Sequence, residues 1–183
     1  MINSKDIIKP FTEKGNYEVN ISLKYLETTL KDYFDDYGLE LNPDFQRGNV
    51  WTEEQQIAYM EFFLRGGQTA RVIYFNCPFF TSGTIDDYKN GQYEMPMVCV
   101  DGLQRLTAIR KFLNNELPVF GYVLNEFEDK DMLLRRRHEL KFNINNLNTK
   151  KEVLQWYLDM NNGGTVHTKE EIDKVKRMIN ECN

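Results

Sequence analysis

The sequence predicts an α+β fold, and three observations predict it. Short segments of alternating apolar and polar residues, or of β-branched and aromatic residues, recur along the chain, as expected of strands. About five or six other segments carry apolar residues at helical spacing. Strands and helices do not alternate in a regular βαβ pattern, which is typical of an α+β protein rather than an α/β protein.

Five segments are predicted to be strands. Residues 19–23 and 140–144 alternate apolar with polar positions, and residues 71–75 are β-branched and aromatic, which is typical of a buried strand. Residues 97–100 form a short apolar strand that we expect at the centre of the sheet. Residues 119–124 are a further candidate strand.

Six segments are predicted to be helices, and local signals mark their ends. Thr52, Thr149 and Thr168 each open a capping box, in which the threonine and a glutamine or glutamate three residues later satisfy each other's backbone donors. Gly38 and Gly66 follow two of the helices, as expected of helix-terminating glycines. The predicted helices span residues 22–37, 52–65, 102–114, 129–139, 149–160 and 168–179.

Length and composition predict one soluble domain. The chain has 183 residues, enough for a sizeable core, with a polar arm over residues 1–18 and a single domain over residues 19–183. Residues 78–94 contain proline and glycines and are expected to form a loop or hairpin, a candidate lid. The sequence lacks an apolar signal segment and any run of roughly eighteen apolar residues, so we expect a cytoplasmic protein without a membrane anchor.

The charge of the chain excludes one class of function. A net charge of −5 does not suit a protein that coats DNA, because phosphate neutralisation supplies most non-specific affinity. Residues 135–138 (RRRH) are a candidate basic patch, and the alternative is a solvated helix end whose arginines suit the helix dipole. The two histidines, His138 and His167, lie in no metal-binding or nuclease pattern.

The functional prediction depends on the segment from Met97 to Ile109. It is read as an apolar strand, a break at Asp101 and Gly102, and a helix whose first turn carries Gln104 and Arg105. The first N–H groups of such a helix have no partner and favour an anion, and an arginine there suits phosphate oxygens. The alternative, which the spacing alone favours, is that the aspartate is an ordinary helix cap.

Three motifs, taken together, resemble a known family. They are residues 43–47 (PDFQR) with Trp51 four residues later, residues 100–108 (VDGLQRLTA) and residues 160–165 (MNNGGT). In this order and spacing they resemble the N-terminal domain of the GmrSD type IV restriction endonucleases, of the ParB/sulfiredoxin-like superfamily. The resemblance covers roughly residues 17–180. The chain departs from the family signature Asp-Gly-Gln-Gln-Arg at Leu103.

The resemblance implies a small mixed sheet surrounded by helices, and nucleoside-triphosphate binding at the turn after the strand. The implied catalytic residues are Asp101, Gln104 and Arg105, with Asp101 as the ligand of Mg²⁺. Magnesium accepts one or two carboxylates together with phosphate oxygens, which would relieve the repulsion between this aspartate and a triphosphate. The implied nucleotide-binding residues are Gln46, Arg47, Gly102, Arg105, Asn161, Gly163 and Gly164.

The predicted function is nucleoside-triphosphate binding, with hydrolysis as a further activity, in a DNA-modification-dependent restriction or defence system or a mobile element. The expected partners are the nucleotide, DNA, and a separate nuclease subunit or other partner protein. Because 183 residues leave no room for the family's second, nuclease domain, we expect a fragment, a stand-alone regulator or half of a two-subunit system. Two alternatives stay open. One is a DNA-binding or nicking ParB-like nuclease, and the other is a non-catalytic interaction or inhibitor protein with the same fold.

Overall fold

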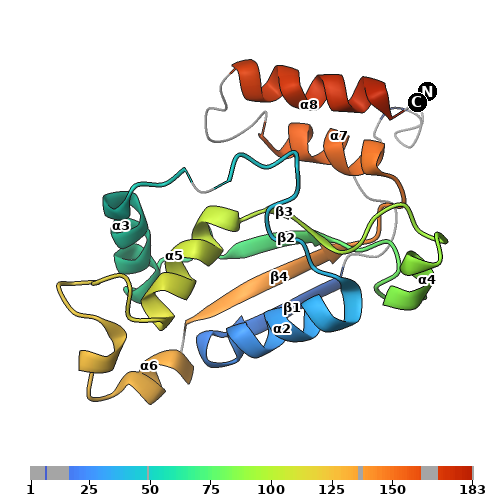
Figure 1. Ribbon diagram of the computed structural model, residues 1–183. Coiled ribbons are helices and arrows are strands. Elements are labelled where there is room, and N and C mark those ends of the chain that lie inside the picture. Colours follow the sequence, from blue (N-terminus) through green and yellow to red (C-terminus); the bar gives the residue numbers. More distant parts are fainter. Residues whose placement is uncertain (1–6, 8–16, 49, 136–137, 162–168, 183) are drawn as a thin grey trace.

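The computed structural model describes residues 7, 17–48, 50–135, 138–161 and 169–182, and it confirms the α+β prediction (Figure 1). The strands are β1 (Tyr17–Ser22), β2 (Val72–Asn76), β3 (Val98–Asp101) and β4 (Glu139–Asn145). The α-helices of the described ranges are α2 (Leu26–Tyr37), α3 (Glu53–Leu64), α4 (Ile85–Lys89), α5 (Leu103–Leu113), α6 (Lys130–Arg135), α7 (Lys150–Asn161) and α8 (Lys169–Glu181). Two short 3₁₀ helices are η1 (Leu23–Tyr25) and η2 (Leu124–Glu126).

The four strands form one mixed sheet in the order β1-β4-β2-β3. β4 pairs antiparallel with β1 and parallel with β2, and β2 pairs antiparallel with β3. The alternating residues Leu140, Phe142 and Ile144 of β4 are fully buried, as expected of an inner strand. The prediction that residues 97–100 form the central strand is wrong, because β3 lies at the edge and meets only an isolated bridge from Glu40 beyond it.

The sheet is covered on both faces, which gives three layers (Figure 1). α2, α3 and α5 lie against one face, where Phe75, Cys99 and Phe142 join the larger apolar cluster. α7 and α8 lie near the other face at the β3 edge, where Val98 and Val100 join a second cluster. Because side chains alternate along β3, this edge strand contributes to both clusters, and its last residue reaches the boundary between the layers.

Several predicted boundaries differ from the observed ones. Residues 119–124 are not a strand, because Phe120 and Gly121 both have positive φ and reverse the chain in a tight turn closed by a bridge between Val119 and Tyr122. The helix expected over residues 129–139 is described only as α6, since Glu139 begins β4. The arm expected over residues 1–18 ends earlier, because β1 begins at Tyr17.

Capping boxes explain the starts of α3, α4 and α7. The boxes predicted at Thr52 and Thr149 are present, with hydrogen bonds to Gln55 and Glu152 respectively, whereas Thr168 lies outside the described residues. Residues 78–94 contain α4, a short helix with its own capping box that the prediction missed. Within the described ranges, every helix is too short or too polar to span a lipid bilayer.

Candidate functional site

A pocket of about 310 Å³ lies at the junction of β3 and α5. Its walls come from segments that are far apart in the sequence: residues 46–51, the turn from β3 into α5, and the end of α7. Every predicted site residue that the structure describes lines this pocket, and Gly163 and Gly164 lie outside the described residues. The predicted residues found there are Gln46, Arg47, Asp101, Gly102, Gln104, Arg105 and Asn161.

Glycine is required at the turn that starts α5. Gly102 has φ +113°, and a Cβ at this position would lie 2.6 Å from Cδ1 of Ile73 on β2. The chain therefore passes close to β2 and enters α5 at Leu103 without an intervening loop. Gly102 is the N-cap residue, and no side chain caps the helix. The expectation that Asp101 caps α5 is wrong, because this residue ends β3 opposite Tyr74.

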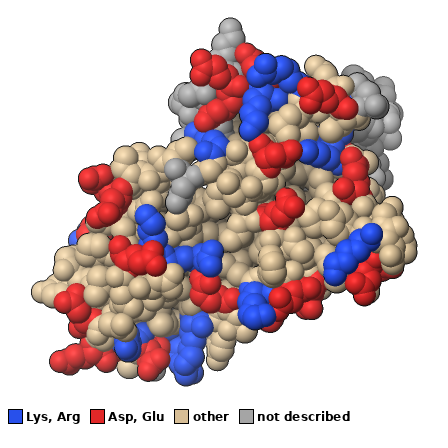
Figure 2. Space-filling view, in the orientation of Figure 1, with Lys and Arg blue, Asp and Glu red and all other residues tan. Residues whose placement is uncertain are grey.

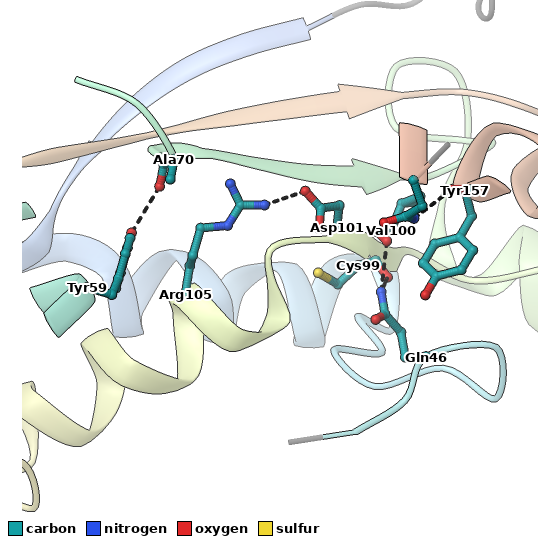
Figure 3. Close-up of polar contacts among 9 residues, drawn as sticks. Gln46, Tyr59, Ala70, Cys99, Val100, Asp101, Arg105 and Tyr157 are labelled. Atoms are coloured by element: carbon teal, nitrogen blue, oxygen red, sulfur yellow. Dashed lines mark hydrogen bonds and ion pairs between the residues drawn. The ribbon is translucent and has the colours of Figure 1, made fainter. Parts of the chain in front are cut away.

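Asp101 instead forms an ion pair with Arg105 of α5, one helical turn away (Figure 3). The pair joins Nη2 of the arginine to Oδ2 of the aspartate. The arginine side chain is 15% exposed and the aspartate side chain 41% exposed, so the carboxylate is the more accessible partner. Both residues line the pocket. An anionic ligand that binds the guanidinium of Arg105 would therefore have to replace the carboxylate of Asp101.

The segment before Arg47 is attached to the outer edge of β3. Nε2 of Gln46 donates to the backbone oxygens of Cys99 at 3.1 Å and Val100 at 2.8 Å (Figure 3). Phe45 is 4% exposed and its ring lies 5.4 Å from that of Tyr157, so it is a core residue. These contacts fix the backbone immediately before Arg47 against the edge of the sheet.

Arg47 reaches the pocket from this segment, and its side chain also contacts α8. Nη1 lies 3.5 Å from Oε2 of Glu171, a single contact at the long end of an ion pair. Their side chains are 24% and 29% exposed, so solvent weakens the interaction. Arg47 and Arg105 therefore line the same pocket, although they are 58 positions apart in the sequence (105 minus 47). Each of them forms an ion pair with a carboxylate.

Gln104 connects α5 to the same loop. Its Oε1 accepts hydrogen bonds from the backbone N–H of Val50 at 3.0 Å and of Trp51 at 3.1 Å. Its Nε2 donates to the backbone oxygen of Gly48. The side chain thus makes three hydrogen bonds with backbone groups of the loop, most of the four that an amide can make.

Two tyrosines near the arginines are unsuited to act as bases. Burial raises the pKa of Tyr59 to about 12, while the positive charge of Arg105 acts in the opposite direction. Its hydroxyl donates to the backbone oxygen of Ala70 at 3.1 Å (Figure 3). Burial likewise raises the pKa of Tyr157 to about 12, with Arg47 acting against it. Both phenols stay protonated at neutral pH, and of the two Tyr157 lines the pocket.

The donor set fits a magnesium ion only together with a ligand. Among the described residues, no group of three or more His, Cys, Asp or Glu side chains is placed to hold a metal. Asp101 is the single carboxylate among the described side chains that line the pocket. One carboxylate with phosphate oxygens and water is a usual environment for magnesium, so the residues fit the ion as part of a magnesium–phosphate complex.

Two other sequence candidates do not contribute to the pocket. None of its lining residues comes from residues 78–94, the candidate lid. In the basic segment, Arg136 and Arg137 lie outside the described residues, and the ring nitrogens of His138 lie 2.9 Å from the backbone oxygens of Leu64 and Leu133. On the face shown in Figure 2, acidic and basic side chains are interspersed and neither sign forms a continuous surface.

Sequence reasoning missed several residues of the site. Trp51 belongs to the first motif without a predicted role, and it both lines the pocket and lies 5.4 Å, ring to ring, from Tyr59. Met160 was named only as the first residue of the third motif and Tyr157 in no motif, yet both line the pocket. Glu171 was expected only to cap α8. No local pattern could have found its contact with Arg47, because 124 positions separate the two residues.

Comparison with known proteins agrees with the resemblance carried by the motifs. The family model of the GmrSD restriction endonuclease, N-terminal domain, matches residues 30–181, a range that includes the whole pocket. The curated proteins and the solved structures gave no match. The family match supports a restriction-system context. Because it covers most of the 183 residues, the chain belongs to the family of the GmrSD restriction endonuclease N-terminal domain.

Proposed function

We propose that the pocket at the β3–α5 junction binds the polyphosphate chain of a nucleoside triphosphate together with Mg²⁺, within a restriction system. The observation that carries the proposal is the convergence of Arg47, Arg105 and the uncapped start of α5 on one pocket. Unpaired first-turn N–H groups and guanidinium groups are the donors that bind phosphate most effectively in proteins.

The carboxylates of Asp101 and Glu171, which pair with the two arginines, favour a ligand with several negative charges. A monoanion gains little by replacing Asp101 or Glu171, since it only exchanges one negative charge for another. A triphosphate can contact both arginines at once, which makes the exchange favourable. Asp101, once separated from Arg105, is then available as the protein ligand of the magnesium ion.

The remaining walls suit the nucleoside. Trp51 and Tyr157 offer aromatic surface on which a base could stack, and Asn161 carries an amide that can both donate and accept. Trp51 comes from the loop after Arg47, and Tyr157 and Asn161 come from the end of α7. We propose that the phosphates lie over the start of α5 and that the base lies toward these residues.

Hydrolysis is the further activity that we propose for this site. Bound magnesium would neutralise charge that develops on the phosphate oxygens. Arg105 and the first-turn N–H groups of α5 would hold those oxygens in place, and Asp101 would orient the attacking water or the ion. Release of inorganic phosphate, compared between wild type and Asp101→Ala, tests this step separately from binding.

Thermal unfolding with ATP, CTP, GTP and UTP, each with MgCl₂, tests the binding proposal. At least one nucleotide is expected to raise the melting temperature saturably, because a ligand at about 100 times its Kd adds about 2.7 kcal/mol to the free energy of unfolding. Arg105→Ala is expected to weaken binding and so reduce the shift strongly without abolishing it, while the unliganded protein melts near the wild-type temperature.

Arg110→Ala is the matched control for this experiment. Arg110 lies on the same helix and pairs with Glu27 at 2.7 Å and 3.0 Å, outside the nucleotide pocket. Its removal deletes the same charge from α5 and should leave the nucleotide-induced shift intact. The proposal is wrong if none of the four nucleotides shifts the wild-type protein, or if both variants lose the shift equally.

A further inference from the structure

The side chain of Gln104 forms hydrogen bonds with the backbone of a loop, whereas the other predicted catalytic residues, Asp101 and Arg105, pair with each other. The amide oxygen accepts from Val50 and Trp51, and the amide nitrogen donates to Gly48. All three partners are backbone groups of the loop that follows Arg47. An amide engaged in this way has little capacity left to orient a water molecule or to contact a phosphate.

Arg47 therefore stands between two amide anchors. On its N-terminal side, Gln46 is attached by its own side chain to the backbone of Cys99 and Val100 on β3. On its C-terminal side, the backbone oxygen of Gly48 is held by Gln104 of α5. Both anchors belong to the β3–α5 unit that also carries Arg105, so they join the two arginine-bearing segments.

The Arg47 side chain itself is weakly held. Its single ion pair with Glu171 is 3.5 Å long and partly exposed to solvent, and such pairs contribute little to position. The location of the guanidinium therefore depends mainly on the backbone that carries it. That backbone belongs to no helix or strand, and Gly48 has φ +68°, a conformation that few other residues adopt readily.

We infer that Gln104 is a positioning residue that acts through Arg47. It holds the loop after Arg47 against the start of α5, so that Arg47 and Arg105 face the same phosphate chain. This inference rests on the proposed nucleotide-binding function and gives Gln104 a different role from water orientation. Gln104 fixes the separation of the two arginines and does not touch the ligand.

A double-mutant cycle tests the inference, with magnesium tripolyphosphate as a base-independent probe and calorimetry to measure Kd. Gln104→Ala and Arg47→Ala are each expected to weaken binding at least tenfold. The double variant should bind no more than about threefold more weakly than Arg47→Ala alone, because residues that act through one another are not additive. Losses that multiply, or a Gln104→Ala variant with wild-type Kd, would overturn the inference.

Arg105 supplies the control background for this cycle. Arg105 pairs with Asp101 and, among the described residues, forms no hydrogen bond or ion pair with the loop, so it acts on the ligand independently of Gln104. In the Arg105→Ala background, Gln104→Ala should still weaken binding several-fold. If Gln104→Ala has no further effect in that background as well, the coupling is not specific to Arg47 and the inference is wrong.

Hydrogen exchange gives a second readout that needs no ligand. The amide protons of Val50 and Trp51 should lose protection at least tenfold in Gln104→Ala, while those of β4 keep it. Unchanged protection would overturn the inference. If wild-type protein binds no phosphate probe but this protection is lost, the nucleotide proposal fails and the anchor itself stands. Gln104→Asn, which keeps the amide but shortens its reach, replaces the alanine variant if that variant does not fold.

Discussion

At the scale of single residues, the side chains of the site form ion pairs and hydrogen bonds with other groups of the protein. Asp101 pairs with Arg105, and Glu171 pairs with Arg47. The side-chain amides of Gln46 and Gln104 form hydrogen bonds with backbone groups. This arrangement avoids unpaired buried charge, which would be costly. A ligand that binds the arginines must therefore replace their carboxylate partners. The residues that lose a partner in this exchange determine the solution conditions under which the ligand binds.

The exchange at Asp101 leads to a prediction about magnesium. In Asp101→Asn, Arg105 loses its carboxylate partner, so the protein should bind tripolyphosphate more tightly than wild type without Mg²⁺. The increase in affinity that Mg²⁺ gives to the wild-type protein should be absent from the variant, because the ligand of the ion is gone. Calorimetric titrations in EDTA and in MgCl₂ measure both effects.

Asp44→Asn provides the control, since it makes the same charge change nearby. Asp44 pairs with Lys150 at 2.7 Å and its side chain is 60% exposed, outside the pocket lining. It should show the wild-type magnesium dependence. An Asp101→Asn variant whose affinity still rises with Mg²⁺ as much as wild type would exclude Asp101 as the metal ligand.

Gly102 gives a prediction about stability at the same scale. Gly102→Ala should lower the free energy of unfolding by about 2 to 4 kcal/mol, because the left-handed backbone and the overlap with Ile73 both oppose a Cβ. Gly91 has φ +80° with open space around it, so Gly91→Ala should cost only about 1 to 2 kcal/mol. Urea denaturation of both variants measures the difference, and equal losses would show that the overlap with Ile73 has no energetic effect.

At the scale of elements, local signals place the starts of several helices, whereas the strands are positioned by their neighbours. α3 and α7 start at capping boxes, and α5 starts at a glycine turn without any side-chain cap. The missing cap leaves the first N–H groups of α5 available at the pocket. The helix that carries the candidate site therefore differs from these two helices in the feature that makes it suitable for an anion.

The capping box of α7 can be tested by a single substitution. Thr149→Ala should lower the free energy of unfolding by about 1 kcal/mol, because the N–H of Glu152 loses its acceptor, which lies 3.2 Å away. Thr28→Ala, at an exposed interior position of α2, is the control and should leave stability nearly unchanged. Urea denaturation is again the measurement, and a loss as small as that of Thr28→Ala would show that the cap does not stabilise α7.

At the scale of the whole molecule, the three layers bury several groups that ionise only at high pH. Burial raises the pKa of Cys77 to about 12 from 9.0, and it raises the pKa values of Tyr33 and Tyr59 to about 12 from 10.0. In the unfolded chain these groups release protons at their ordinary values. The folded state keeps its protons over a range in which the unfolded state loses them.

Stability should consequently fall as the pH rises above about 9 and continue to fall until about 12, with no contribution from these groups below that range. The sign follows because the folded pKa values are raised, so the unfolded state binds fewer protons in this window. Urea denaturation at intervals from about pH 8 to about pH 11 checks it. Cys77→Ala should show a shallower fall between about pH 9 and pH 10 than wild type; identical pH profiles would contradict the assignment.

The residues that could be predicted from the sequence are those whose role is local or is carried by a motif. Gly102 as the turn, Thr52 and Thr149 as caps, and the burial of Phe142 each follow from rules that act over a few residues. The motif resemblance also gave Arg47 as a member of the site. The partners of Gln46, Arg47 and Gln104 could not be predicted, because each lies more than fifty positions away in the sequence.

The sequence by itself determined most of the helices, the strands of the sheet, the α+β class and the family. Only the tertiary structure decided that β3 is an edge strand, that Arg47 and Arg105 line one pocket, and that Gln104 holds the loop after Arg47. The physical reason is the separation in sequence over which each kind of interaction acts. Backbone conformation and capping depend on neighbours within a turn or two, whereas strand order and side-chain pairing depend on how two apolar clusters pack on opposite faces of one sheet.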